Sequence, residues 1–169
     1  MIISRKWAMP SPHTFEIKPI RQLIDKYIAG KSKIIDPFSN NNHIAHITND
    51  LDPACNADFH MDAIDFLKLF ADKSVDCVLY DPPYSTRQVS ECYTKLGKSV
   101  NMQTTQTSYW TNQKKEISRI VDENGIVITF GWNSGGIGKK YGFEILEILL
   151  VPHGGWHNDT ICTVERKIN

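Results

Sequence analysis

The sequence lacks a basic excess, and this absence limits how the chain can bind nucleic acid. Its 169 residues include 19 lysines and arginines and 19 aspartates and glutamates, so the formal net charge is zero. Proteins that bind nucleic acid through its phosphates usually carry a surplus of positive charge. We therefore expect any nucleic-acid binding by this chain to be local, weak or shared with a partner.

Long apolar runs and paired cysteines are also missing. No stretch approaches the roughly 18 consecutive apolar residues of a membrane span, and the first apolar residues precede the first charges, unlike a signal peptide. The four cysteines form no C-x-x-C pair, so neither a disulfide nor a zinc site is expected. The sequence predicts a cytoplasmic protein with no membrane contact and no bound metal.

The apolar residues that are present predict an α/β fold. Three segments have apolar residues near helical spacing: 17–28, 61–70 and, more loosely, 109–121. Four short apolar runs end in polar or turn residues, as buried parallel strands do: 32–37, 44–48, 75–80 and 125–131. Residues 143–152 and 160–165 predict a closing antiparallel hairpin. We expect one domain over residues 1–169, a sandwich with a mostly parallel sheet that ends in this hairpin.

One long interval has no sustained apolar period. Residues 85–108 are rich in Ser, Thr, Gln and Lys, and loops of this length inside compact domains are usually functional or disordered. We predict a long loop or lid there. In and near this interval, four lysines are candidates for a phosphate path or are simply solvated surface: Lys95, Lys98, Lys114 and Lys115.

The segment 81–84 carries the chemistry. It reads Asp81, Pro82, Pro83 and Tyr84 and follows the predicted strand 75–80, at the strand end where open α/β sheets bind ligands. Two prolines fix a stiff turn. The Asp81 carboxylate and the Pro82 carbonyl can each accept one N–H of a conjugated amine, which localises its lone pair for attack on a methyl sulfonium, while Tyr84 stacks on the ring. The alternative is a turn that only ends a strand.

Three further segments precede this turn in a recognisable order, and with them the chain resembles the S-adenosylmethionine-dependent amino-methyltransferases of DNA. The resemblance implies that Asp50 binds the ribose hydroxyls of the cofactor, that Asp62 accepts from its adenine amine, and that residues 12–17 line its methionine end. The residues that match the family's cofactor motifs are Thr14, Phe15, Asp36, Pro37, Phe38, Ser39, Asn40, Asp50, Leu51, Asp62, Ala63 and Asp81.

Each of these residues also has a structural interpretation. Asp36 and Asp50 are in sequence contexts typical of helix caps and turns, and Asp62 is equally suited to cap a helix. Phe15 and Phe38 are residue types that more often belong to the core.

The resemblance implies methyl transfer from S-adenosylmethionine to the exocyclic N6 amine of adenine in DNA. Asp81, where related enzymes for cytosine carry Ser, favours adenine. A base in a duplex has to be flipped out first. The alternatives are an RNA or protein-glutamine acceptor, and a non-catalytic cofactor-binding subunit. The resemblance further implies a bacterial or phage-infected host cell, with restriction, phage self-protection and regulation all open as contexts.

The chain departs from the family pattern at its first motif. After the motif at residues 35–38, only residues 39–43 precede the second predicted strand, which is too short for a helical crossover. We expect the helix there to be shortened or absent, with the Asn run making a tight turn. One sheet face near these strands is then expected to be bare, and a second copy or a separate specificity partner is expected to cover it. No segment beyond 85–108 is available for target recognition.

The turn before the last predicted strand has two interpretations. The resemblance implies that residues 153–159 face the target base, with Trp156, His157 or Asn158 in contact with it, whereas glycine pairs also simply form turns. His153 and His157 are four residues apart, but Gly154 and Gly155 disfavour the helix that a two-histidine metal site needs.

Overall fold

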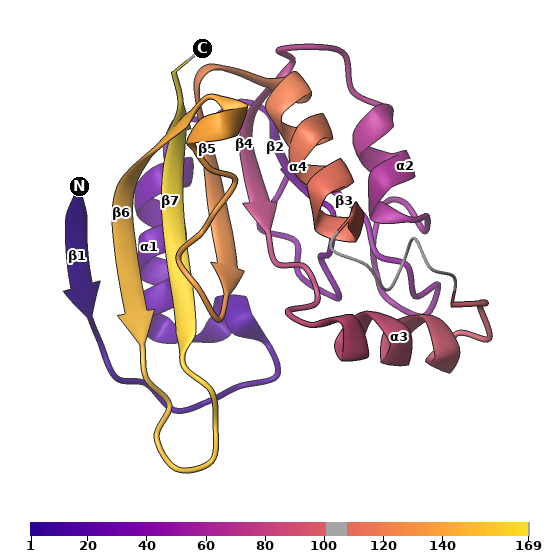
Figure 1. The fold of residues 1–169 in the computed structure, drawn as a ribbon, viewed down its shortest axis with the longest axis horizontal. Coiled ribbons are helices and arrows are strands. Elements are labelled where there is room, and N and C mark those ends of the chain that lie inside the picture. The colour runs from indigo at the N-terminus through magenta and orange to yellow at the C-terminus, as the bar shows by residue number, and fades with distance from the viewer. Residues whose placement is uncertain (101–107, 169) are drawn as a thin grey trace.

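A computed structural model describes residues 1–100 and 108–168, and its centre is a seven-stranded sheet (Figure 1). The strand order is β1-β6-β7-β5-β4-β2-β3. The strands are β1 (Ile2–Arg5), β2 (Ile34–Asp36), β3 (Ile47–Thr48), β4 (Val75–Tyr80), β5 (Val121–Gly131), β6 (Phe143–Val151) and β7 (Thr160–Lys167).

The sheet is mixed in the predicted way. β2 pairs in parallel with β3 and β4, β4 pairs in parallel with β5, and β7 lies antiparallel between β5 and β6. The predicted fold class, a Rossmann-like sandwich with a mostly parallel sheet and a closing antiparallel hairpin, is confirmed. The sequence did not predict β1, which adds a parallel edge strand beside β6.

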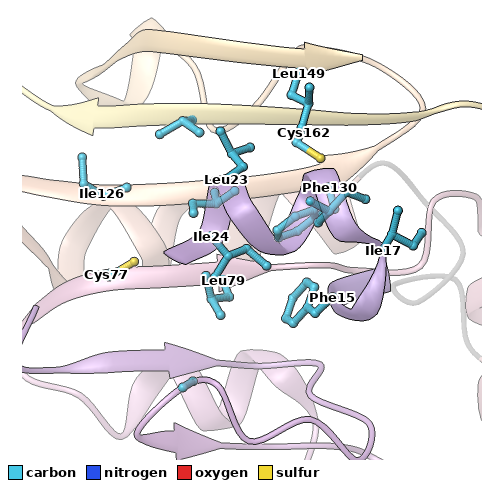
Figure 2. Packing of buried hydrophobic residues seen from close by; sticks show 14 of the residues in the cluster. Phe15, Ile17, Leu23, Ile24, Cys77, Leu79, Ile126, Phe130, Leu149 and Cys162 are labelled. Carbon is cyan, nitrogen blue, oxygen red and sulfur yellow. The ribbon is translucent and has the colours of Figure 1, made fainter. Parts of the chain in front are cut away.

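Helices cover both faces of the sheet. On one face, α1 (Lys18–Ile28) packs the fully buried Ile20 and Ile24 against β4 and β5, where Leu79 and Phe130 meet it (Figure 2). On the other face, α2 (Ala63–Lys68) and α4 (Ser108–Ile120) share a second core. The remaining helical elements are η1 (Thr14–Glu16), α3 (Thr86–Lys95) and η2 (Lys139–Tyr141).

The prediction of a loop over 85–108 was wrong for its first half. α3 begins there because the Ser85 side chain accepts a hydrogen bond from the Gln88 amide (3.2 Å) and caps the helix. Val89 and Tyr93, four residues apart, form its buried face. The remainder of the predicted lid includes residues 101–107, which lie outside the described residues.

The connection between β2 and β3 is longer than the expected residues 39–43, but it lacks a helix, as predicted. Residues 37–46, all of which the structure describes, contain turns and no helix. The sheet face beside it is nevertheless not bare, because Ala45 packs over Ile34 and both are buried. Thr48 of β3 is also buried, and its hydroxyl donates to Asp58 (2.9 Å). The prediction of a bare sheet face near these strands was therefore wrong. A partner that covers this face stays a prediction.

None of the helices in residues 1–100 and 108–168 is long and apolar enough to cross a membrane.

Candidate active site

A cavity of about 740 Å³ opens at the carboxyl edge of the parallel strands. The segments that follow β2, β3 and β4 form its floor, and η1 and α3 form opposite walls. Of the residues predicted to bind the cofactor, all except Asp36 line it. They are Thr14, Phe15, Pro37, Phe38, Ser39, Asn40, Asp50, Leu51, Asp62, Ala63 and Asp81. The other predicted catalytic residues, Pro82, Pro83 and Tyr84, line the same cavity.

The 81–84 turn is held from three directions. The Tyr84 hydroxyl donates to Asp81 Oδ1 (2.5 Å), and the Tyr84 amide donates to Gln88 Oε1 of α3 (2.6 Å). The Trp110 indole N–H, from the first turn of α4, donates to the Pro83 carbonyl (3.0 Å). The turn is therefore fixed in position before any ligand arrives.

Asp81 is a carboxylate in a poorly solvated place. Desolvation by the surrounding protein raises the pKa of Asp81 above its ordinary value, and hydrogen bonds from the side chains of Tyr84 and Thr14 oppose part of that rise. Thr14, one of the predicted cofactor residues, thus lies close to the 81–84 turn. The Tyr84 ring lies edge-on to Trp132, with the ring centroids 5.5 Å apart.

Asp36 lies beneath the cavity floor. It is fully buried, its Oδ1 accepts from the Phe38 amide (2.9 Å), and its Oδ2 has no hydrogen-bond partner among the described residues. Burial raises the pKa of Asp36 well above its ordinary value, and the negative charges of Asp81 and Asp50 raise it further. The pKa of Asp36 is therefore sensitive to the charges of both cavity carboxylates.

The Asn run makes the tight turn that its sequence predicts. Asn40 has a φ of 52°, in the left-handed region that Asn tolerates best among non-glycine residues. Its amide donates to Asp50 Oδ2 (2.8 Å), and the Asp52 amide donates to Asp50 Oδ1 (2.9 Å). Asp50 is thus fixed by two backbone donors, and its oxygens keep lone pairs for a diol. Ser39 is buried, and its hydroxyl donates a hydrogen bond to the Asn49 carbonyl (3.2 Å).

Asp62 is the N-cap of α2, as the structural interpretation has it. Its Oδ1 accepts from the Ile64 amide (3.2 Å), and its Oδ2 accepts from the Tyr93 hydroxyl of α3. Asp62 still lines the cavity, so capping and ligand binding are compatible. The bond to Tyr93 links α3 to the floor of the site.

The predicted apolar contacts have dual roles. Phe15 is buried and packs against Phe130, with centroids 4.8 Å apart, yet it also lines the cavity. Phe38 is half-buried and lies 6.0 Å from the ring of Tyr80. Ala63 is buried and Leu51 half-buried.

Several residues of the site were not predicted. Asn49 is buried, and its side-chain amide donates to the carbonyls of Pro37 (3.1 Å) and Met61 (3.0 Å), which ties two floor segments together. Tyr93 and Trp110 contact the site across more than twenty residues of sequence. No local pattern signals such contacts, although an apolar period in 89–93 indicates the buried face that carries Tyr93.

A second cavity of about 220 Å³ lies on the other side of the same turn. Pro82, Pro83 and Tyr84 line both cavities. Trp110 and Trp132 line the second, together with Lys114, whose ammonium group donates to the Gly136 carbonyl. Of the four lysines considered for a phosphate path, Lys95 lines the first cavity and Lys114 the second, whereas Lys98 and Lys115 are exposed.

The first cavity suits a cationic cofactor of moderate size. Its volume falls in the range of roughly 300–1,000 Å³ that is usual for small-molecule sites. The carboxylates of Asp50, Asp62 and Asp81 line it, with Asp36 beneath. S-adenosylmethionine carries a sulfonium and an ammonium group, whose positive charges these carboxylates attract. The residues present therefore fit that cofactor.

No metal site is apparent in the part of the chain that the structure describes. No three or more His, Cys, Asp or Glu side chains are grouped there to hold an ion. His153 and His157 do not act as a pair, because the ring of His153 is bonded to the Ala8 carbonyl (2.9 Å) and the Thr160 hydroxyl (2.8 Å). His157 is exposed, as are Trp156 and Asn158.

Comparison with known proteins shows the fold. No family model matches the sequence, and none of the curated proteins matches it. TrmN from Thermus thermophilus superposes with a TM-score of 0.59 at 16% identity over 90% of this chain, which spans only 49% of TrmN. Burkholderia thailandensis 1,6-didemethyltoxoflavin-N1-methyltransferase, solved with its substrate and S-adenosylhomocysteine, gives 0.59 at 10% identity over 90% of this chain and 78% of that one.

A SAM-dependent methyltransferase from Archaeoglobus fulgidus also gives a TM-score of 0.59, at 10% identity over 89% of this chain and 92% of that one. Identities this low show a shared architecture. The cavity described above lies at the carboxyl edge of the parallel strands of this fold, where Asp50, Asp62 and Asp81 line it. The chain has the Rossmann-like α/β fold of the SAM-dependent methyltransferases.

Proposed function

We propose that the protein transfers a methyl group from S-adenosylmethionine to the N6 amine of adenine in DNA. One observation carries the proposal: a single cavity is lined both by the carboxylates of Asp50 and Asp62, in the segment that follows β3, and by the rigid 81–84 turn. These carboxylates suit a cationic methyl donor, and the turn suits a poorly nucleophilic aromatic amine. The fold comparison supports methyl transfer, and the Asp at position 81 supports adenine.

Named residues account for cofactor binding in this proposal. Asp50 accepts hydrogen bonds from the ribose hydroxyls, and Asp62 accepts from the adenine amine of the cofactor. Thr14 and Phe15 lie beside the methionine end. When bound, the cofactor supplies an electrophilic methyl sulfonium, and the carboxylates around the cavity attract its positive charge.

The 81–84 turn acts on the acceptor amine. The Asp81 carboxylate and the Pro82 carbonyl each accept one N–H, so the nitrogen lone pair is directed at the methyl carbon. As the new carbon–nitrogen bond forms, the carbon–sulfur bond breaks. The methylated nitrogen then gives one proton to Asp81, whose raised pKa favours uptake of that proton before its release to solvent.

Tyr84 has a contact to Asp81 in addition to the stacking role predicted for it. Its hydroxyl occupies one lone pair of Asp81 Oδ1, and a carboxylate offers about four such sites. Asp81 can therefore keep Tyr84 and accept an amine N–H at once. Tyr84 then sets the orientation of Asp81, and its ring face remains the stacking surface.

The direct test is transfer of a labelled methyl group to defined acceptors. We expect label in DNA that contains adenine and none in the same sequence with every adenine replaced. Preferential label in RNA or in a glutamine-containing protein would redirect the proposal to those acceptors. Micromolar binding of S-adenosylmethionine in calorimetry, with no transfer to any acceptor, would instead favour a non-catalytic subunit.

The pH dependence of transfer should reflect the pKa of Asp81. Because that pKa is raised, Asp81 stays protonated to a higher pH than an ordinary aspartic acid, for which the pKa is about 3.9. The protonated form is a poor acceptor, so kcat should fall as the pH decreases through the raised pKa of Asp81. Asp81→Asn should remove this acid limb from whatever activity remains. An unchanged limb in that variant would assign the titration to another group.

A further inference from the structure

The four tryptophans of the chain all lie at the carboxyl edge of the sheet. Trp132 directly follows β5, and Trp156 lies in the loop between β6 and β7. Trp7 follows β1, and Trp110 is in the first turn of α4 beside Pro83. Figure 1 shows these segments at the same end of the sheet as α3, which borders the candidate active site.

Three of these indoles are exposed to an unusual degree. The relative exposure is 42% for Trp132, 61% for Trp7 and 103% for Trp156, and Met9 beside Trp7 is 68% exposed. In the described segments 6–13, 131–137 and 152–159, Trp and Met are the only exposed large apolar residues. Isolated aromatic faces separated by polar residues therefore make up this rim.

The exposed indoles stand on a fixed base. The residues that follow β1 extend its pairing with β6, because the amides of Lys6 and Ala8 donate to the carbonyls of Leu150 (2.9 Å) and Pro152 (3.2 Å). His153 is buried and bonds both the Ala8 carbonyl and the Thr160 hydroxyl. Trp7 is thereby held on the loop that carries Trp156.

The rim is continuous with the 81–84 turn. Trp132 contacts the ring of Tyr84 edge-on, and Trp110 bonds the Pro83 carbonyl. Both line the second cavity, where Thr129 Oγ1 is buried without a hydrogen-bond partner among the described residues. Trp110 and Trp132 thus place two indoles directly beside the amine-binding turn.

We propose that the acceptor is an unpaired nucleic-acid strand whose bases stack on these indoles. This inference rests on the proposed function, because it names the form in which that substrate reaches the site. An indole stacks on the face of a base, and base faces are hidden in a duplex but accessible in a single strand. The zero net charge of the chain agrees with this, since duplex binding depends strongly on phosphate neutralisation.

The charges near the rim favour a nucleic acid over a protein partner. Residues 1–15 contain two basic residues, Arg5 and Lys6 next to Trp7, and no Asp or Glu. Lys114 lines the second cavity. Cations beside several aromatic faces are the combination that binds single strands with little sequence preference. A protein interface core would be expected to expose Leu, Ile or Phe as well, and the described rim exposes none.

The test measures quenching of intrinsic tryptophan fluorescence by a 12-nucleotide single strand with one adenine and by its duplex. We expect tighter binding of the single strand, with a salt dependence no steeper than about −2 on a log–log plot if the strand follows the rim, where the cations named above are Arg5, Lys6 and Lys114. Trp156→Ala should weaken single-strand binding at least about fivefold, as loss of one base stack does. It should raise KM more than it lowers kcat.

Matched variants separate stacking from other causes. Trp156→Phe should restore most of the affinity for the single strand, whereas Trp156→Leu should not. Leu69 is an exposed apolar residue at the C-terminus of α2, away from the rim, so Leu69→Ala should have no effect. Equal affinity for duplex and single strand, or Trp156→Ala binding like the wild type, would overturn the inference. So would a Trp156→Ala variant that changes self-association in sedimentation but not oligonucleotide affinity. Failure of methyl transfer with intact single-strand binding would overturn the proposed function alone.

Discussion

Replacing Asp81 by alanine should reduce kcat for methyl transfer by about a hundredfold to a thousandfold, the usual effect of losing one preorganised polar group at the reacting atom. The amine then loses one of its two acceptors, and the Tyr84 hydroxyl loses its partner at 2.5 Å. The affinity for S-adenosylmethionine should change much less, because Asp50 and Asp62 remain. Single-turnover kinetics and calorimetry on the same preparation measure the two quantities.

Asp81→Asn is the matched control for this prediction. Asparagine retains one acceptor oxygen and the size of the side chain, so we expect an intermediate rate. The account of the 81–84 turn would be contradicted if Asp81→Ala transferred methyl groups at the wild-type rate. It would also be contradicted if the substitution abolished cofactor binding, since Asp81 would then act on the cofactor rather than on the amine.

Gly136→Ala should destabilise the fold by roughly 2–5 kcal/mol. Gly136 has a φ of 51°, which costs an L-residue about 1–2 kcal/mol. A Cβ at this position would in addition overlap the Glu165 carboxylate, which is fully buried and accepts from the amides of Ile137 (2.5 Å) and Gly138 (2.9 Å). Displacing this carboxylate leaves buried polar groups unpaired at about 1–3 kcal/mol.

Gly155→Ala separates the two contributions. Gly155 has a similar φ of 58°, but no heavy atom lies within 4 Å of the position its Cβ would take. We expect only the conformational cost of about 1–2 kcal/mol there. Urea unfolding of both variants measures the difference, and equal destabilisation would show that the contact with Glu165 contributes nothing. Because Gly136 also lines the second cavity, Gly136→Ala should impair acceptor binding as well.

The fold could be predicted where apolar patterning is strong. The run at 75–80 coincides with β4, because all but one of its residues are buried. β1 could not be predicted in this way, since three of its four residues are exposed and its pairing with β6 joins segments about 145 residues apart. α3 was missed because only Val89 and Tyr93 of its ten residues are buried, so its period is weak within a polar segment.

The site could be predicted as far as its residues follow strand ends. Topology brings the carboxyl ends of parallel strands to one edge, so Asp50 and Asp81 were expected together and both line the cavity. Asp36 also follows this rule, but its side chain turns back to the Phe38 amide and lies below the cavity. The bonds of Tyr93 to Asp62 and of Trp110 to Pro83 depend on how helices pack, which sequence spacing does not encode.

The most direct test of the central claim is mass spectrometry of nucleosides from an adenine-containing single strand incubated with the protein and S-adenosylmethionine. The account predicts N6-methyldeoxyadenosine as the product, formed by the wild type and strongly reduced with Asp81→Ala. A methyl group on cytosine or on a ring nitrogen of adenine, or N6-methyldeoxyadenosine formed equally well by Asp81→Ala, would contradict it.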